Sequence, residues 1–496
     1  MPTKVEALRQ RMFDVNALYA AGAIMDWDQQ TMMPKGGAAA RAAHSGILSR
    51  MAHERFTSDE TARLLEEATN EVALGTEDAA LVRVVRRDFD QSTKLPSAFV
   101  EEKSRLSSEA HEKWVQARET DSFATFAPTL EQMFSLARQE ADYYGWTGHR
   151  YDALLDCYEE GWTAVDVQNM FGTIREPMVR LVEEIRERGQ STDAVGLNGT
   201  WDNNRQRKFS EHLIHAIGFD TDRGRLDTAP HPFCTGWSVT DIRLTTRFKD
   251  MIGSAIFGSL HEAGHGMYEQ GSPLAWDRTP LAGGVSLGVH ESQSRLWENI
   301  VGRSLPFWRK FLPELHANFP NLAAFDVDTF YRMINQVEPS LIRVEADEVT
   351  YNLHILIRFE LEMALLAGEM QVADLPEAWR AKYQQYLGIT PETDKEGCLQ
   401  DVHWSMGGIG YFPTYTIGNL LSFQIWRKLT EEIPNTDDLI AVGNFAPILG
   451  WLQDRIYRHG RYYTPKELVL QATGKPLDAN DYLAGITAKY RSVYSL

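Results

Sequence analysis

Apolar residues recur at spacings of three and four along most of the chain, with charged residues between them. Two long stretches have this pattern, residues 166–188 and residues 344–369, and the second stops at a glycine. Such spacing places apolar side chains on one face of an α-helix, and glycine commonly follows a helix end. The pattern therefore predicts a mainly α-helical fold built from long amphipathic helices.

One segment, residues 238–248, has a different pattern. Its polar residues Asp241, Arg243 and Thr245 fall on one face at the two-residue period of a β-strand, and apolar residues are mixed with them. This is the only strand that the sequence predicts with any strength. We expect a small β element that leads directly into the next helix.

The connections between the predicted helices are short. Glycine and proline residues that favour turns cluster near positions 35, 93, 197 and 407, and none of these clusters is long enough to be a flexible linker. We find no repeat of fixed period and no low-complexity tract. The sequence therefore predicts a single body over residues 1–496.

Composition restricts the location and the partners of the chain. Of its 496 residues, 43% are hydrophobic and 24% charged, and no segment has the 18 consecutive apolar residues of a membrane-spanning helix. The N-terminal residues lack the apolar run of a secretory signal, and the three cysteines lie far apart, so we expect a protein of the reducing cytoplasm. A formal net charge of −19 repels phosphate backbones and anionic lipids, which disfavours nucleic acid and membranes as partners.

The segment after the strand predicts a helix that begins near Asp250, a candidate N-cap, and stops at Gly271. This helix contains the sequence HEAGH. His261 and His265 are four residues apart, so they point the same way at about 6 Å along the axis and can bind one metal ion. Glu262 projects beside them, where it can take a proton from a water activated by the metal.

A third metal ligand must come from another segment, and the isolated cysteines leave histidines and carboxylates to supply it. Glu291 lies 26 residues after His265 (291 minus 265) on a second predicted helix, and would complete a set of two histidines and one glutamate with an open position. His290 and Glu298 are rivals on the same helix. Glu269 is weaker because it lies one turn beyond His265 and fits a solvated charge better.

A two-metal carboxylate site is disfavoured. Glu262 and His265 also form an E-x-x-H pair, but a two-metal site of that kind requires the pair twice. No other histidine has a glutamate three residues before it. The sequence therefore predicts one divalent metal ion per chain.

Five short motifs occur in order along the chain. They are HPF at 231–233, D-x-R-x-T at 241–245, HEAGH at 261–265, HESQ at 290–293 and G-x-x-Q-D-x-H-W at 397–404. In these motifs the chain resembles the M32 family of metallocarboxypeptidases, the thermostable carboxypeptidase Taq type. The resemblance in sequence covers nearly the whole chain.

The resemblance implies that Glu291 is the third ligand and that the helices surround a deep substrate groove. It places the N-terminal helices, about residues 1–75, as a lid over that groove. It further implies a homodimer that removes single C-terminal residues with broad specificity. Zinc is the metal that it implies first, and cobalt is the alternative.

The last motif and the residues after it offer hydrogen-bond donors for the oxyanion of the reaction. His403, Tyr411 and Tyr415 lie around a glycine-rich bend that can bring them over the metal. Proximity to the motif favours His403, and the sequence does not choose between the two tyrosines. Pro232 favours an extended backbone at His231, so the motif is expected to form a fixed turn at the wall of the groove. There His231 either contacts the substrate or holds the loop.

A carboxypeptidase must recognise a free C-terminal carboxylate, and a guanidinium that pairs with it in a fork geometry is a strong device for this. Arg243 is the first candidate because it lies on the strand before the metal helix and shares a face with Asp241. The resemblance links this arginine to binding of the substrate C-terminus. A purely architectural Asp241–Arg243 pair is the alternative, and Arg343 and Arg358 are reserve candidates.

The sequence thus predicts a zinc-type metallocarboxypeptidase that acts on peptides with a free C-terminus, with Glu262 as the base and then the acid. An oligopeptidase or dipeptidyl carboxypeptidase with the same H-E-x-x-H helix is the alternative. A non-catalytic helical binding protein with a structural metal is disfavoured, because such a site gains nothing from a glutamate base inside its motif.

Overall fold

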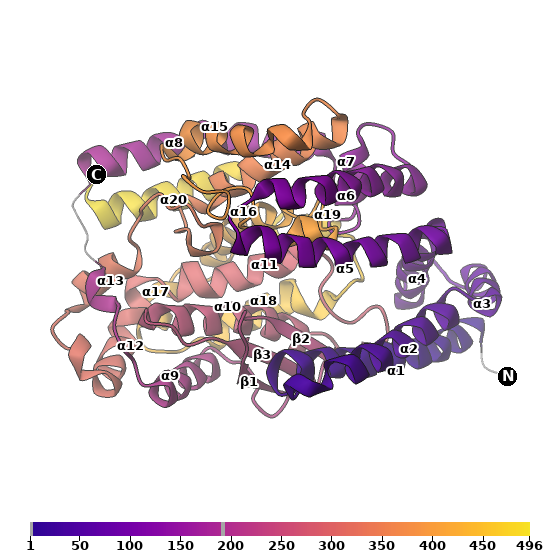
Figure 1. The fold of residues 1–496 in the computed structure, drawn as a ribbon. Coiled ribbons are helices and arrows are strands. Elements are labelled where there is room, and N and C mark those ends of the chain that lie inside the picture. Colours follow the sequence, from indigo (N-terminus) through magenta and orange to yellow (C-terminus); the bar gives the residue numbers. More distant parts are fainter. Residues whose placement is uncertain (1–2, 190–193) are drawn as a thin grey trace.

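The computed structural model describes residues 3–189 and 194–496, and it confirms a mainly α-helical fold with one small sheet (Figure 1). The helices before the sheet are α1 (Lys4–Thr31), α2 (Ala38–Phe56), α3 (Asp59–Thr69), α4 (Glu77–Lys94), α5 (Ser97–Glu119), α6 (Phe123–Tyr144), α7 (Arg150–Leu155), α8 (Ala164–Arg188) and α9 (Asn203–Ala216). Those after it are α10 (Ile252–Gln270), α11 (Leu287–Arg295), α12 (Leu305–Asn318), α13 (Val327–Ile334), α14 (Tyr351–Ala367), α15 (Leu375–Leu387), α16 (Pro413–Glu432), α17 (Thr436–Ala441), α18 (Ala446–Arg455), α19 (Pro465–Thr473) and α20 (Ala479–Tyr494).

The small sheet has three strands, β1 (Gly224–Thr228), β2 (Cys234–Ser238) and β3 (Asp241–Thr246), in the order β1-β3-β2. β1 runs parallel to β3, and β2 runs antiparallel to it. The prediction of a single strand is therefore wrong, although its position is right. The two missed strands have five residues each, too short to establish an alternating pattern.

The helix that carries HEAGH lies where the sequence predicts, but its N-cap is a different residue. Gly271 follows its last residue, whereas its N-cap is Met251, which makes no capping hydrogen bond with its side chain. The predicted N-cap Asp250 is wrong because this residue serves another segment: its carbonyl accepts from the Gly199 amide (2.7 Å) and the Trp201 indole (3.0 Å). The chain between β3 and α10 is thus fixed to the loop before α9.

The two helices predicted from long periodic stretches are both present. α8 begins at Ala164, where Thr163 forms a capping box with Asp166. α14 begins at Tyr351 and so covers only the later part of the predicted stretch, while it ends at Gly368 as expected. The late start is explained by Asp347, whose carboxylate accepts from the backbone amides of the residues just before the helix and so holds the turn that precedes it.

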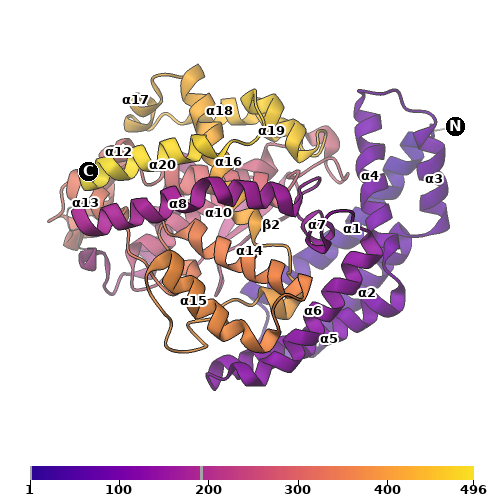
Figure 2. The same cartoon turned by 90° about the horizontal axis from the view of Figure 1, so that it is seen from above.

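Helix α16 lies between the two large apolar cores of the molecule. Its residues Ile417 and Leu420 pack into one core with α6, α8, α14 and α20, whereas Leu421 and Ile425 pack into the other with α9, α10, α12 and the sheet. A third, smaller core joins α1, α3 and α4. Because α16 also packs along α11, these two helices form the boundary at which the cores meet. Figure 2 shows α16 beside α20, with which it also packs.

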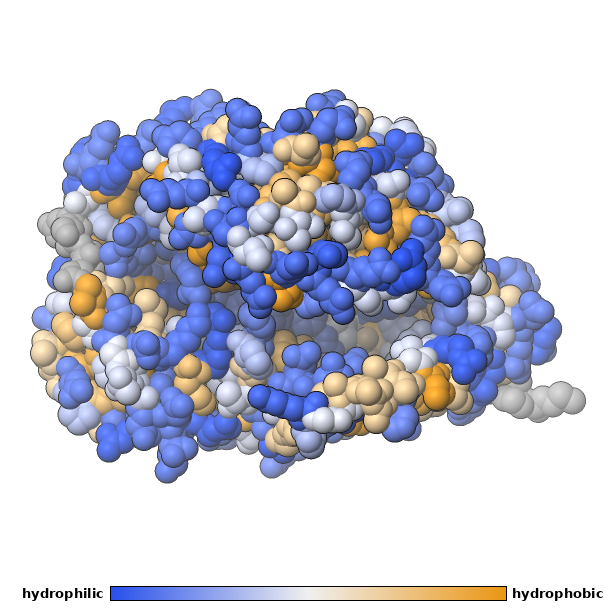
Figure 3. All heavy atoms as spheres, in the orientation of Figure 1, coloured by the Kyte–Doolittle hydropathy of each residue, from blue (hydrophilic) through white to orange (hydrophobic). Residues whose placement is uncertain are grey.

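A groove crosses the face of the molecule seen in Figure 3. It runs as a hollowed band between α5 on one side and α1, α2 and the sheet on the other, as comparison with Figure 1 shows. Among the described helices, none combines the length and the apolar character needed to cross a membrane.

Candidate functional site

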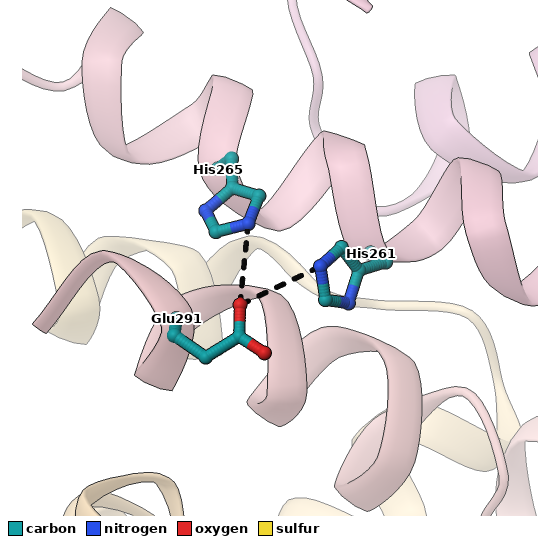
Figure 4. A group of neighbouring side chains, drawn as sticks. All are labelled: His261, His265 and Glu291. Atoms are coloured by element: carbon teal, nitrogen blue, oxygen red, sulfur yellow. Dashed lines mark ion pairs between the residues drawn. The ribbon is translucent and has the colours of Figure 1, made fainter. Parts of the chain in front are cut away.

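His261, His265 and Glu291 come together between α10 and α11 (Figure 4). Each side chain offers one ligand atom, and these atoms lie within 4.8 Å of one another. Glu291 Oε2 lies 3.6 Å from His261 Nε2 and 3.5 Å from His265 Nε2. The three residues that the sequence selects as metal ligands therefore converge on one point.

Two glycines allow this convergence by letting helices approach closely. A Cβ atom on Gly264, inside HEAGH, would lie 2.6 Å from the carbonyl oxygen of Gln293 on α11. On the other side of α11, a Cβ on Gly418 of α16 would lie 2.5 Å from the Cβ of Glu291. α11 is therefore held between α10 and α16, and the position of the Glu291 carboxylate depends on both contacts.

The outer nitrogen of each histidine is fixed by a further hydrogen bond. His261 Nδ1 lies 2.9 Å from Glu298 Oε2, and His265 Nδ1 lies 2.8 Å from His290 Nδ1. His290 is held in turn by Glu269, whose carboxylate lies 2.6 Å from Nε2. Such partners orient metal-binding imidazoles and leave the inner nitrogen free for the ion.

The rival ligand candidates Glu298 and His290 therefore contact the outer nitrogens of the two histidines, and Glu269 contacts His290. Glu298 lies in a π-helical segment, Leu296–Val301, that continues α11, and His290 lies on α11 itself. Glu269 differs from the solvated charge that the sequence suggests, because it binds both His290 and the backbone amide of Gly284 (3.2 Å).

Arg295 is a site residue that the sequence analysis missed. Its Nε donates to Glu291 Oε1 (2.7 Å), and its guanidinium lies over the ring of Tyr351 (4.6 Å). Ser294 donates to the other oxygen of Glu291 (3.0 Å). The spacing of four residues between Glu291 and Arg295 on one helix was the signal that could have found this contact.

The charges of the cluster fit a bound cation. Burial alone would lower the pKa of His261, but the carboxylates of Glu291 and Glu298 outweigh it and raise the pKa to about 9. Burial lowers the pKa of His265 to about 4, so this imidazole is neutral at neutral pH, the form that binds a metal. A proton on His261 supplies the positive charge that a divalent ion would replace. Two imidazoles and one carboxylate also match the donor set of catalytic zinc sites.

Glu262 lies next to the cluster, 6% exposed, and its side chain makes no hydrogen bond to any described residue. Burial raises its pKa to about 7. A carboxyl group with this pKa can both accept and donate a proton near neutral pH, as general acid and base catalysis requires.

Arg243 is held at the centre of the sheet. Its Nε and Nη2 donate to the two oxygens of Asp241 (2.5 and 3.1 Å), and its guanidinium lies between the rings of Trp27 on α1 (5.0 Å) and Trp237 on β2 (5.1 Å). The Asp241–Arg243 pair expected from the sequence is present. The pair fits both an orienting role and an architectural one.

The two reserve arginines share one carboxylate inside the protein. Asp401 accepts from Arg343 Nε (2.9 Å) and from Arg358 Nε (2.6 Å). Arg358 has no exposed surface, which removes it from contact with substrate. Arg343 is also buried, at 5% exposed, and its guanidinium lies over the ring of Tyr415 (5.1 Å).

His403, Tyr411 and Tyr415 form a cluster on the same side as Glu291. His403 Nε2 lies 3.3 Å from the Tyr415 hydroxyl, and the Tyr411 and Tyr415 rings are 5.4 Å apart. Burial raises the pKa of both tyrosines, and the charge of Glu291 adds to the rise, so they remain hydroxyl donors. Tyr415 lies one turn before Gly418, which explains its closeness to the cluster.

His231 is exposed at the edge of the sheet, and no hydrogen bond of its side chain is present among the described residues. The rest of its motif is fixed: Phe233 N donates to Thr245 Oγ1 (2.8 Å), and Pro232 Cγ lies beside Gly258 of α10. The turn is therefore rigid, while the His231 side chain stays outside the cluster.

The cluster combines two histidines of α10 with Glu291 of α11, and Glu262 lies between the two histidines in the sequence. This set of residues is typical of a metallopeptidase site. The family model described as Carboxypeptidase Taq (M32) metallopeptidase matches residues 7–490. The chain belongs to the M32 family and is a metallocarboxypeptidase. Family membership implies a divalent metal and peptide substrates.

Relatives of known name agree with this assignment over nearly the whole chain. The chain is 41% identical to thermostable carboxypeptidase 1 of Thermus thermophilus over 490 residues, 96% of each protein. It is 38% identical to carboxypeptidase 1 of Bacillus subtilis over 481 residues, again 96% of each. Its structure is similar to that of the M32 carboxypeptidase of Deinococcus radiodurans, with a TM-score of 0.96 at 40% identity, covering 99% of this chain and all of that one.

Proposed function

We propose that the enzyme removes single C-terminal residues from peptides, with broad specificity for the residue released. The observation that carries this proposal is the convergence of His261, His265 and Glu291 (Figure 4), with Glu262 adjacent to His261 in the sequence. The family resemblance extends the proposal to a homodimer, and the three widely separated cysteines support a location in the reducing cytoplasm.

The metal of this proposal is zinc, with cobalt as the alternative, held by His261, His265 and Glu291. A bound zinc ion would supply Lewis acidity that polarises the scissile carbonyl and activates water. The donor set of two imidazoles and one carboxylate supports zinc. His290 and Glu298 would hold the two imidazoles in the orientation that binding needs.

Glu262 is the proposed base and then the proposed acid. Its carboxylate takes a proton from the attacking water and hands it to the leaving amine, which returns the residue to its starting state. Burial raises its pKa to about 7, so neither transfer is far uphill at neutral pH. The absence of a hydrogen-bond partner for Glu262 among the described residues leaves its oxygens available.

His403, Tyr411 and Tyr415 are the proposed donors to the oxyanion that develops on the substrate carbonyl. Donors placed in advance, in a site that excludes water, stabilise such a charge strongly. The Tyr415 hydroxyl is already oriented by His403 (3.3 Å), and both tyrosines lie within the field of Glu291. His231, which is exposed next to β2, is proposed to contact the substrate from outside.

Arg243 is the proposed clamp for the C-terminal carboxylate. Asp241 orients its guanidinium, which also contacts the rings of Trp27 and Trp237. Trp27 belongs to α1, so its contact with Arg243 connects the N-terminal helices to the proposed clamp. We therefore also propose that these helices act as a lid over the groove.

The product sizes from a defined peptide test the proposed function. We expect mass spectrometry of a timed digest to show a ladder of products that differ by one C-terminal residue, and the C-terminally amidated peptide to be cleaved far more slowly. Release of dipeptides would assign a dipeptidyl carboxypeptidase, and cleavage of the amidated peptide at internal bonds would assign an oligopeptidase.

The Arg243→Ala variant should lose recognition of the free carboxylate. We expect kcat/KM to fall by a factor that corresponds to a loss of about 2 to 4 kcal/mol in transition-state stabilisation, since a charge-assisted contact to the substrate is lost. The variant should also distinguish far less between free and amidated peptides. Steady-state kinetics on the two peptides measures both effects.

The chain offers a matched control in the neighbouring strand. Arg225 lies opposite Arg243 in the register of β1 and β3, and it pairs with Asp227 in the same way (2.7 Å). Arg225→Ala should change kcat/KM by an amount equivalent to less than about 1 kcal/mol, because Arg225 is half-exposed and pairs with Asp227 instead of binding the substrate. Equal losses in the two variants, or unchanged preference for the free peptide in Arg243→Ala, would assign the clamp to another residue.

A further inference from the structure

A carboxyl group in the interior of the protein, Glu362 on α14, has no part in the reaction described above. It has no exposed surface, and among the described residues no basic side chain forms an ion pair with it. Three hydrogen-bond donors converge on it instead. Its Oε1 accepts from the Trp404 indole (2.7 Å), and its Oε2 accepts from the Tyr151 hydroxyl (2.8 Å) and the Gly410 amide (3.2 Å). Two of the three donors thus belong to the bend formed by residues 403–412.

These two donors are the direct neighbours of residues that are proposed to act on the substrate. Trp404 follows His403 in the chain, and Gly410 precedes Tyr411. Gly410 has a φ of 88°, so the backbone turns sharply just before Tyr411. Glu362 therefore holds the bend at two points, one beside each proposed oxyanion donor.

The other contacts of the bend do not replace this connection to α14. Asp401, bound by Arg343 and Arg358, fixes the chain on the near side of His403. The backbone hydrogen bonds within the bend join residues that are close in the sequence, such as Gly408 N to the carbonyl of His403 (2.8 Å). The position of the bend beyond His403 therefore depends on its packing and on Glu362.

The hydrogen bonds of Glu362 are all used, and their donors are buried. Burial raises the pKa of Glu362 to about 7, although the three hydrogen bonds act against this. A buried carboxyl group is costly unless its oxygens are hydrogen-bonded. The Trp404 indole and the Gly410 amide bind different oxygens, so the loss of either acceptor would leave one buried donor without a partner.

We propose that Glu362 is a positioning residue, which holds the bend so that His403 and Tyr411 face the substrate carbonyl. This proposal rests on the proposed function, because that function assigns His403 and Tyr411 as donors to the oxyanion. Glu362 is fully buried and acts only through the bend. Donors to an oxyanion must be placed in advance, and a displacement of about 1 Å can lower the rate by about 10²-fold.

The Glu362→Gln variant tests the proposal because glutamine keeps the size of the side chain but has only one acceptor oxygen. In either orientation its NH2 group faces the Trp404 indole or the Gly410 amide, so one contact with the bend is lost. We expect kcat for a peptide with a free C-terminus to fall at least about tenfold, with KM within about twofold of wild type. Hydrogen exchange measured by mass spectrometry should be faster over residues 403–412.

Glu360→Gln is a matched control on the same helix. Glu360 also accepts from a tyrosine hydroxyl, that of Tyr386 (3.0 Å), and it pairs with Lys382 instead of binding the bend. This variant should keep wild-type kcat and wild-type exchange over the bend. Trp404→Phe removes the indole donor while Glu362 stays, and it should change both quantities in the same direction as Glu362→Gln. Metal content and far-ultraviolet circular dichroism report whether each variant is folded.

A variant that lacks both donors of the bend, His403→Ala with Tyr411→Phe, separates an effect through the bend from an effect on stability alone. In this background, Glu362→Gln should lower kcat further by less than about threefold, because residues that act as a unit are not additive. A further loss as large as in the wild-type background would mean that Glu362 does not act through these donors. Wild-type kcat in the variant that lacks both donors would instead contradict the proposed function of the bend, and the role of Glu362 would fall with it.

Two other outcomes overturn the role of Glu362 alone. Wild-type kcat in a folded Glu362→Gln protein would mean that the reaction does not depend on this contact. Wild-type exchange over the bend would mean that Glu362 does not hold it, whatever the change in kcat. If Glu362→Gln does not fold, either result in Trp404→Phe decides against the proposal in the same way.

Discussion

Replacing Glu262 by glutamine is expected to lower turnover by at least about 10²-fold while the protein keeps its fold and its metal. The glutamine has nearly the same shape, but it can neither take a proton from water nor hand one to the leaving amine. The metal should stay because Glu262 is not one of the three residues whose ligand atoms converge. The loss should therefore appear mainly in kcat.

Steady-state hydrolysis of a peptide with a free C-terminus measures this effect, with metal content determined by atomic emission on the same sample. A metal-loaded, folded variant that keeps more than about a tenth of wild-type activity would contradict the assignment of Glu262 as the base, because general acid and base catalysis typically contributes 10² or more. Loss of the metal would instead place Glu262 among the ligands or their supports.

The helices and the central motif could be predicted from local sequence because their signals are local. The apolar spacing of α8 and of the later part of α14 reports which face is buried, and HEAGH places two histidines on one side of α10 whatever surrounds it. The site residues that lie in other segments needed more. Glu291 was selected over His290 and Glu298 through the family resemblance, since spacing alone left all three open.

The features that the sequence missed depend on contacts between distant segments. β1 and β2 are short and acquire their pairing from β3, and the N-cap of α10 changed because the loop before α9 uses the Asp250 carbonyl. The roles of Gly264 and Gly418 as points of close helix contact also require the packed structure, because an isolated glycine in a helix carries no sign of what lies against it.

The reserve arginines illustrate the same limit. The sequence treats Arg343 and Arg358 alike, as cations on or near a later helix. In the structure both bind Asp401, a residue of the last family motif, and Arg358 is fully buried. Burial removes one candidate for substrate binding and assigns it to holding the loop that carries His403.

Glu291→Ala is expected to lose metal and activity together, whereas Glu298→Ala should bind metal about 10- to 100-fold more weakly and regain activity in excess metal. The first change removes a ligand atom from the cluster, while the second removes only the group that orients His261 (2.9 Å). Metal content after dialysis against a chelator, followed by titration with zinc, measures both. Equal metal loss in the two variants would reopen the choice of the third ligand.

The electrostatics of α11 explain why the two variants should differ. Glu291 is held in its charged form chiefly by Arg295, against the effect of burial, so its removal leaves the Arg295 charge close to the two histidines and opposes any cation there. Removal of Glu298 leaves Glu291 and its contact with Arg295 in place.

Because a buried pair that loses one partner also costs stability, about 3–5 kcal/mol, Glu291→Gln should be measured beside Glu291→Ala. Glutamine keeps the size of the side chain, so a folded Glu291→Gln protein that still binds zinc with wild-type affinity would exclude Glu291 as the anionic ligand.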